Sequence, residues 1–137
     1  MRTLLIIIGL LLAPACHSEE LLVIASPQVP DNSISLKKLA DIYLVKKMLW
    51  SDGTSISPVN REASSPQRER FFEIVFNIPP EEFAEYIDRL RFQGKLPPVV
   101  QTSNKAVLEF VRSVPGAIGY VDGSLSTAGV KVLAHIQ

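Results

Sequence analysis

Short apolar segments alternate with segments of helical periodicity along this chain of 137 residues, and that alternation limits the possible folds more than any other feature. Residues 21–25 are apolar without interruption, which is typical of a strand buried on both faces. Strands that alternate with helices favour a parallel sheet covered by helices. We therefore predict an α/β fold with a mainly parallel sheet flanked by helices. Further strands are expected at 56–59, 99–101, 117–121 and 130–133, and helices are expected to begin after Ser35, at Pro66, at 79–80 and after Thr102 or Ser103.

Apolar residues at helical spacing predict which face of each helix is buried. An aromatic cluster at this spacing is interpreted as core rather than as part of a cofactor site. The expected buried stripes are Leu36, Leu39, Ala40, Tyr43 and Leu44 in the first helix, Phe71, Phe72, Val75 and Phe76 in the second, and Phe83, Tyr86, Ile87 and Leu90 in the third.

Residues 1–18 are predicted to be a signal peptide. Arg2 supplies a small positive region, residues 4–12 an apolar region, and Ala13-Pro14-Ala15 a cleavage site of the A-x-A type. The apolar run is shorter than the ~20 residues of a membrane span, so no transmembrane span is expected after cleavage. We expect cleavage after Ala15 or nearby, export to the periplasm, and a single domain at 19–137.

Cys16 is the only cysteine, which excludes an intramolecular disulfide. Cleavage after Ala15 would make Cys16 the mature N-terminus, the position that carries the lipid in bacterial lipoproteins. Ala13 stands where that recognition sequence usually has leucine. Two alternatives therefore remain open, namely a lipoprotein anchored through Cys16 and a soluble periplasmic protein.

Composition and motifs argue against several classes of function. Lys plus Arg equals Asp plus Glu, at 14 each, so nothing indicates a nucleic-acid surface. The two histidines, His17 and His135, have no partner at metal-ligand spacing. No G-x-S-x-G motif, P-loop or dinucleotide fingerprint occurs, and Glu81 and Glu82 are explained by the dipole at a helix start. We expect no enzyme activity, no catalytic residue, no metal and no cofactor.

A candidate anion site lies in the segment 60–72, where a strand is followed by a capped helix. Ser65 is suited to the N-cap and Pro66 to the first helical position. The backbone amides of Gln67 and Arg68 would then point out of the helix start, at the positive end of its dipole. The guanidinium groups of Arg61 and Arg68 would flank this position and suit an oxyanion. The alternative interpretation is a plain strand-to-helix turn with surface arginines.

Four motifs occur in the order SLKKLADIY (35–43), WSDG (50–53), PVNR (58–61) and PGAIGYV (115–121). With these motifs the chain resembles the phosphate ABC-transporter substrate-binding proteins, of the type 2 periplasmic-binding-protein superfamily. The resemblance covers about residues 21–122 and corresponds to one of the two lobes of such proteins. It implies a single-lobe domain, with the second lobe expected to be absent. Val45 stands where the family usually has glycine.

The resemblance also implies roles for individual residues. In the family an arginine, a serine, a glycine amide and a threonine hold phosphate, and Arg61 and Ser65 match the first two. Pro66 replaces the glycine and Gln67 the threonine, while Arg68 keeps the arginine that follows. Proline removes one backbone donor, and a longer amide replaces a short hydroxyl, so two anion contacts are lost or altered.

Two functions follow from these expectations. The first is a periplasmic substrate-binding-like protein that binds phosphate or a similar oxyanion weakly through Arg61, Ser65, Gln67 and Arg68. A single lobe would leave the anion facing water, where each charge-assisted contact is screened. The second is a non-enzymatic envelope interaction module, derived from one lobe of a solute-binding protein. The cleft face is the face that such a lobe normally turns toward its partner lobe. In this module it would contact a protein partner or a second copy of the chain.

Overall fold

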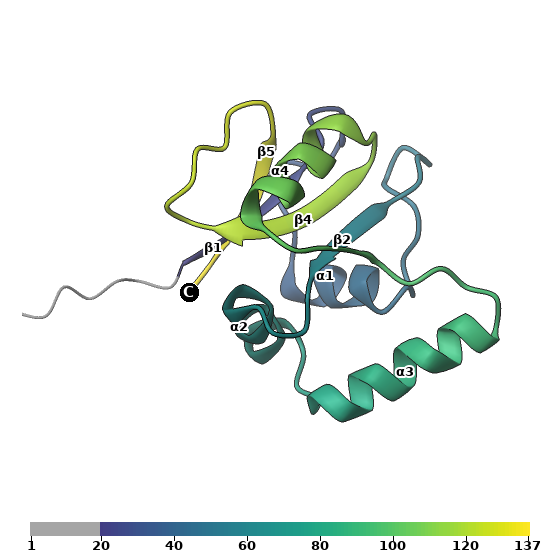
Figure 1. The fold of residues 1–137 in the computed structure, drawn as a ribbon. Coiled ribbons are helices and arrows are strands. Elements are labelled where there is room, and N and C mark those ends of the chain that lie inside the picture. The colour runs from purple at the N-terminus through teal and green to yellow at the C-terminus, as the bar shows by residue number, and fades with distance from the viewer. Residues whose placement is uncertain (1–19) are drawn as a thin grey trace, which may run out of the picture.

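A five-stranded sheet organises residues 20–137, which are the part of the chain that the computed structural model describes (Figure 1). The predicted signal peptide and Cys16 lie outside the described residues. The strand order is β3-β2-β4-β1-β5. The strands are β1 (Leu21–Ala25), β2 (Ser57–Arg61), β3 (Val99–Gln101), β4 (Ala117–Asp122) and β5 (Lys131–Ile136), and the helices are α1 (Leu36–Tyr43), α2 (Pro66–Val75), α3 (Pro80–Phe92) and α4 (Asn104–Ser113).

The predicted α/β class, with a sheet flanked by helices, is confirmed, and the strand directions add one detail. Strand β2 runs parallel to both β3 and β4. Strand β1 runs antiparallel to both β4 and β5, so β2, β3, β4 and β5 share one direction and β1 is reversed. The sheet is therefore mixed in its hydrogen bonding although most strands point the same way. A continuous apolar run cannot reveal its own direction, because it has the same pattern either way.

Three of the four described helices begin at a serine cap, and α3 begins at Pro80 without a side-chain cap. Each of the three serines adopts an extended backbone and accepts a hydrogen bond from the amide three residues later, which satisfies a donor that the first turn leaves free. Ser103, rather than Thr102, caps α4. The cap distances are 3.1 Å for Ser35, 3.2 Å for Ser65 and 3.0 Å for Ser103.

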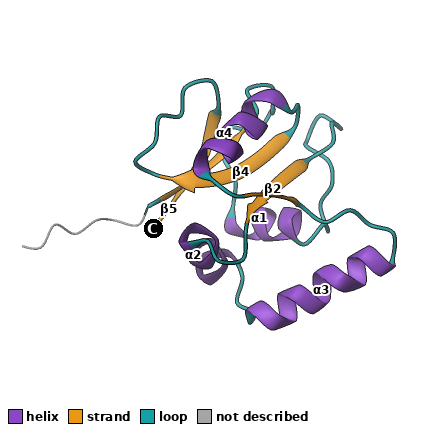
Figure 2. Cartoon of the chain, in the orientation of Figure 1, coloured by secondary structure: helices purple, strands orange, loops and turns teal. Residues whose placement is uncertain are grey.

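Strand β1 is buried on both faces, as its apolar run predicted. Leu21, Val23 and Ala25 belong to the core cluster that packs against α1, α2 and α3. Leu22 and Ile24 face the second cluster, which packs against α4. Figure 2 shows α4 on one side of the strands and α1 and α2 on the other. Within residues 20–137, no helix is both long and apolar enough to cross a bilayer.

Two details of α1 bear on the sequence expectations. Leu36 is 49% exposed, so its assignment to the buried stripe was wrong, and Ile42 is buried instead. Leu36 is the first residue of the helix, where side chains have no preceding turn to pack against. Just after α1, Val45 has φ 58°, in the left-handed region that favours glycine. The glycine that the family usually has at this position would adopt the same backbone conformation without strain.

Two buried tyrosines join the sheet to the helices. The hydroxyl of Tyr43 donates to the backbone oxygen of Val59 at 2.8 Å, and that of Tyr120 donates to the side-chain oxygen of Asn60. Burial raises the pKa of both phenols above the ordinary value of about 10. Both groups are therefore neutral in the folded protein well into the alkaline range.

We expect the stability of the protein to fall steeply above pH 10. The unfolded chain then loses phenol protons that the folded protein keeps, so the free energy of unfolding decreases by about 1.4 kcal/mol per pH unit for each tyrosine. Urea unfolding at pH 9, 10 and 11 measures this slope. Tyr43→Phe and Tyr120→Phe should each make the slope shallower. An urea midpoint that stays constant from pH 9 to 11 would contradict the expectation.

Candidate functional site

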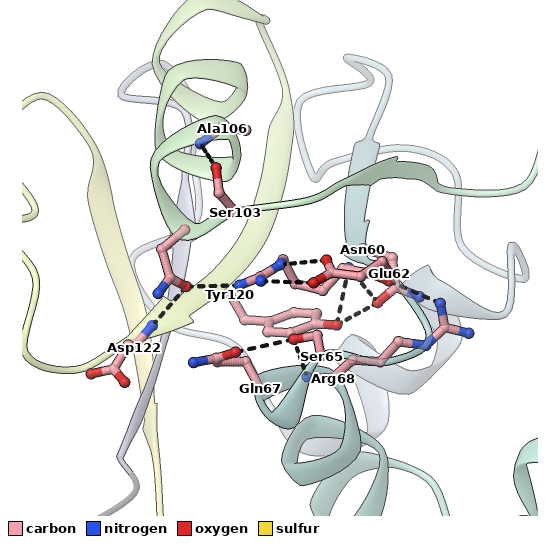
Figure 3. A network of polar contacts seen from close by, with 11 residues as sticks. Asn60, Glu62, Ser65, Gln67, Arg68, Ser103, Ala106, Tyr120 and Asp122 are labelled. Atoms are coloured by element: carbon pink, nitrogen blue, oxygen red, sulfur yellow. Dashed lines mark hydrogen bonds and ion pairs between the residues drawn. The ribbon is translucent and has the colours of Figure 1, made fainter.

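The candidate site lies at one edge of the sheet, where β2 and β4 end and where α2 and α4 begin (Figure 3). Asn104, the first residue of α4, joins these elements with its side-chain oxygen. That oxygen accepts from Nη1 of Arg61 at 3.1 Å and from the amide of Asp122 at 3.4 Å. The N-terminus of α4 therefore lies beside the Arg61 guanidinium, and the N-cap of α2, Ser65, follows four residues after Arg61 along the chain. The carboxyl ends of parallel strands are where α/β sheets commonly bind ligands.

The Arg61 side chain is only 8% exposed and has a carboxylate as its main partner. Its Nε donates to Glu62 at 2.9 Å and its Nη2 donates to the other carboxylate oxygen at 3.1 Å. This two-pronged contact holds the pKa of Glu62 below its usual range, so Glu62 is ionised at neutral pH. With Asn104, these contacts use three of the five N–H groups of the guanidinium. An internal carboxylate thus occupies the edge of Arg61 that suits an oxyanion.

The backbone of Arg61 is fixed by a buried polar group. Its amide donates to the Asn60 side-chain oxygen at 2.9 Å and approaches the Tyr120 hydroxyl at 3.3 Å. Asn60 and Tyr120 are 3% and 1% exposed, and the Tyr120 hydroxyl donates to Asn60 (Figure 3). Because buried polar groups that are fully paired rigidify their surroundings, Arg61 leaves the strand in a defined direction.

Sequence reasoning missed these supporting residues. Asn60 stands between the predicted strand 56–59 and the candidate Arg61, and a polar residue at that point is a signal that could have drawn attention to it. Glu62 was equally visible as the neighbour of Arg61. The roles of Tyr120 and Asn104 could not be found in this way, because they lie 59 and 43 residues from Arg61 along the chain.

Ser65 and Gln67 form the tip of α2. Ser65 is 2% exposed, and its hydroxyl accepts from the Arg68 amide and donates to the Gln67 side-chain oxygen at 3.0 Å. The expectation that the Arg68 amide is free for an anion is therefore wrong in this structure, because the cap uses it. The pKa of the nearby Asp122 carboxyl lies below its usual range, chiefly because the amide and the hydroxyl of Ser124 donate to it, with a smaller effect from the Gln67 side chain.

Arg68 does not flank the helix tip as expected. Its Nη1 donates to the backbone oxygen of Arg61 at 2.9 Å, and its guanidinium lies over the rings of Phe72 and Phe83, at 5.0 and 5.8 Å from their centres. These contacts draw the side chain toward α3. The structure therefore brings Arg61, Ser65 and Gln67 together at the tip, while the charge of Arg68 lies to one side.

A hollow of about 380 Å³ borders the tip at Pro66 and Gln67, and its lining has four acidic residues and one arginine among eight. Such a lining disfavours an anion there, so an oxyanion would have to bind at the Arg61 side of Gln67. Among residues 20–137, no cluster of His, Cys, Asp and Glu is suited to a metal ion. The hollow is lined by Glu20, Leu21, Pro66, Gln67, Glu69, Arg70, Glu73 and Asp122.

Comparison with solved structures places this architecture among binding proteins. A phosphate ABC transporter substrate-binding protein from Clostridium perfringens, solved with bound phosphate, superimposes with a TM-score of 0.68 at 23% identity, over 82% of this chain and 43% of that one. An ABC-type phosphate transport receptor from Vibrio cholerae gives 0.65 at 20% identity, over 82% and 44%. PstS from Borrelia burgdorferi gives 0.66 at 21% identity, over 83% and 46%.

The described chain therefore has the fold of phosphate ABC-transporter substrate-binding proteins, as its four motifs implied. It spans less than half the length of each of these structures. No family model matches the sequence, and no curated protein sequence matches it. At these identities the likeness establishes the fold and leaves the ligand to be argued from the site.

Proposed function

We propose that this protein is an exported, non-enzymatic, binding-protein-like module that binds a phosphate-like oxyanion weakly through Arg61, Ser65 and Gln67, with Arg68 displaced from the site by its contacts with Phe72 and Phe83. The observation that carries the proposal is the nearly buried Arg61 guanidinium, which contacts the first residue of α4 and lies four residues before the N-cap of α2. The exported location rests on residues 1–18, and the domain is taken to be 19–137. Anchoring through Cys16 is part of the same proposal only if cleavage exposes that residue.

The physical support comes from three sources of positive potential. Two helix N-termini contribute partial positive charge, and the guanidinium contributes a full charge with a forked set of donors. Two N–H groups of Arg61 remain beyond its contacts with Glu62 and Asn104 among the described residues. An oxyanion at the tip can accept from these groups and from the Gln67 side-chain amide.

Three features oppose tight binding. Pro66 has no amide to donate, the Ser65 hydroxyl and the Arg68 amide already pair with each other, and the Glu62 carboxylate neutralises Arg61. An incoming anion must compete with that carboxylate. We expect a dissociation constant nearer ~1 mM than ~1 μM, a difference of about 4 kcal/mol.

Isothermal titration with phosphate and with sulfate tests the proposal. We expect weak binding to the unchanged protein and none to Arg61→Ala. Glu62→Gln should bind a few-fold more tightly, because a repelling charge near the site costs about 1 kcal/mol in a water-like environment. Arg89→Ala is the matched control, since Arg89 is exposed on α3 and does not line the hollow that Asn60, Arg68 and Arg91 share. Equal heats for the unchanged protein and Arg61→Ala would overturn the assignment of the site.

A second candidate function is an envelope interaction module that no longer binds a solute. The paired state of Arg61 and the cap that uses the Arg68 amide favour it. This candidate expects no heat with either anion, even for Glu62→Gln, together with association through the cleft face. Light scattering of the mature protein measures such association with a second copy. A strict monomer that binds phosphate would exclude it.

A further inference from the structure

The end of α3 and the segment after it expose an unusual amount of apolar surface. Phe92 is 95% exposed and Leu96 is 86% exposed, and Val99 and Val100 follow at 46% and 51%. Figure 1 shows this end of α3 at the margin of the molecule, away from β1 and β5. Large apolar side chains that gather in one short segment commonly mark a surface that contacts something else.

The same segment carries only positive charge. Residues 89–105 contain Arg89, Arg91, Lys95 and Lys105 and no acidic residue, in a chain whose net charge is zero. Arg91 contacts Asp88 at 3.2 Å, but both side chains are more than half exposed. A pair of this kind is screened by solvent and holds Arg91 only weakly. Basic residues therefore flank the apolar ones along this part of the chain.

Pairing with another strand is disfavoured at this edge. Strand β3 lies at the end of the sheet but has only three residues. Pro97 and Pro98 precede it, and proline has no N–H to donate to a neighbouring strand. Short strands and prolines are devices that protect sheet edges from strand addition. A second copy of the chain therefore has little backbone to pair with.

We propose that residues 89–100 dock the protein on an anionic phospholipid surface. Phe92 and Leu96 enter the boundary between headgroups and acyl chains, and Arg89, Arg91 and Lys95 meet the lipid phosphates. This combination of exposed apolar residues and a basic rim is what interfacial binding requires. The docking segment contains none of the proposed oxyanion-binding residues, although its Arg91 and Val100 line one hollow with Arg68.

The docking segment is anchored to the rest of the molecule. Phe83 and Leu90 of α3 are 3% and 4% exposed. The Phe83 ring packs edge-on against Phe72 of α2, with 4.5 Å between ring centres. The start of α3 is therefore held against α2, and near its end Leu90 is buried while Phe92 stays exposed. Little ordering entropy opposes the insertion of a surface that is already formed.

A fluorescent reporter tests the docking in the full chain. We expect the emission of Phe92→Trp to shift to the blue with vesicles that contain phosphatidylglycerol, and to remain unchanged with phosphatidylcholine alone. Trp50 is 2% exposed and supplies a constant background. Met48→Trp is the matched control, because Met48 is 58% exposed and lies outside the docking segment. A shift of equal size in Met48→Trp would overturn the proposal.

Vesicle sedimentation measures the energetics of the same contact. The double variant Phe92→Ser, Leu96→Ser should lower partitioning roughly ten-fold or more. Arg91→Gln and Lys95→Gln should each lower it about five-fold, and added salt should have a similar effect. A chain of residues 20–137 is compared in parallel, because residues 4–12 are apolar themselves. This shorter chain contains the whole sheet and both core clusters.

Three results would overturn the proposal. The first is partitioning of the double variant equal to that of the unchanged protein. The second is equal binding to neutral and anionic vesicles, which would remove the role of the basic rim. The third is a lipid-free dimer that the double variant converts to a monomer, which would show that a second copy covers the apolar residues.

Discussion

Replacing Phe71 with alanine is expected to lower the free energy of unfolding by about 3–5 kcal/mol. Phe71 is fully buried at the centre of the larger core cluster. Its ring stacks on Tyr120, with 4.0 Å between centres and 7° between planes, and meets Tyr43 edge-on at 4.9 Å. The alanine variant loses these contacts and leaves a cavity that the surrounding sheet and helices cannot fill. Urea unfolding at neutral pH measures the loss.

Phe92→Ala is the matched control for this substitution. Phe92 is 95% exposed, so the same chemical change should alter stability by no more than about 0.5 kcal/mol. Because Tyr120 also holds Asn60 beneath Arg61, Phe71→Ala should weaken anion binding as well. Similar losses for the two variants would contradict the core that this structure describes.

Replacing Gly116 with alanine is expected to cost about 2–5 kcal/mol. The backbone of Gly116 has φ 75°, which costs an L-residue about 1–2 kcal/mol. A side chain there would also collide with the backbone oxygen of Ser55, and overpacking adds about 1–3 kcal/mol. A backbone atom cannot move aside by changing rotamer. The Gly116 carbonyl accepts from Trp50 Nε1 at 3.0 Å, so a shift would break that buried contact too.

Gly53→Ala separates the two contributions. Gly53 has φ 85° but nothing within 4 Å of an added side chain. It should therefore lose only the conformational part, about 1–2 kcal/mol. Thermal unfolding of both variants gives the difference that belongs to the collision with Ser55. If Gly116→Ala proved no worse than Gly53→Ala, the close approach of Ser55 to the 116 turn would be wrong.

Much of the fold could be predicted from local chemistry. The strand at 21–25 and the short strand at 99–101 have the predicted bounds, and Ser35 and Ser65 cap the helices that they were expected to cap. These features depend on residues a few positions apart, so the sequence contains the whole interaction. The exposure of Leu36 was missed because helical spacing shows which face of a helix is apolar. It does not show how far along the helix the neighbouring elements bury that face.

The sequence by itself determined that Arg61 and Ser65 lie where a strand leads into a capped helix, and that is all it determined about the site. Only the tertiary structure decided that Glu62 holds Arg61 by two contacts, that Asn104 joins it from another helix, and that Arg68 points toward α3. The reversal of β1 was decided in the same way. The physical reason is distance along the chain. A cap is closed within one helical turn, whereas the direction of a strand and the partner of a guanidinium depend on which distant segments the core brings together.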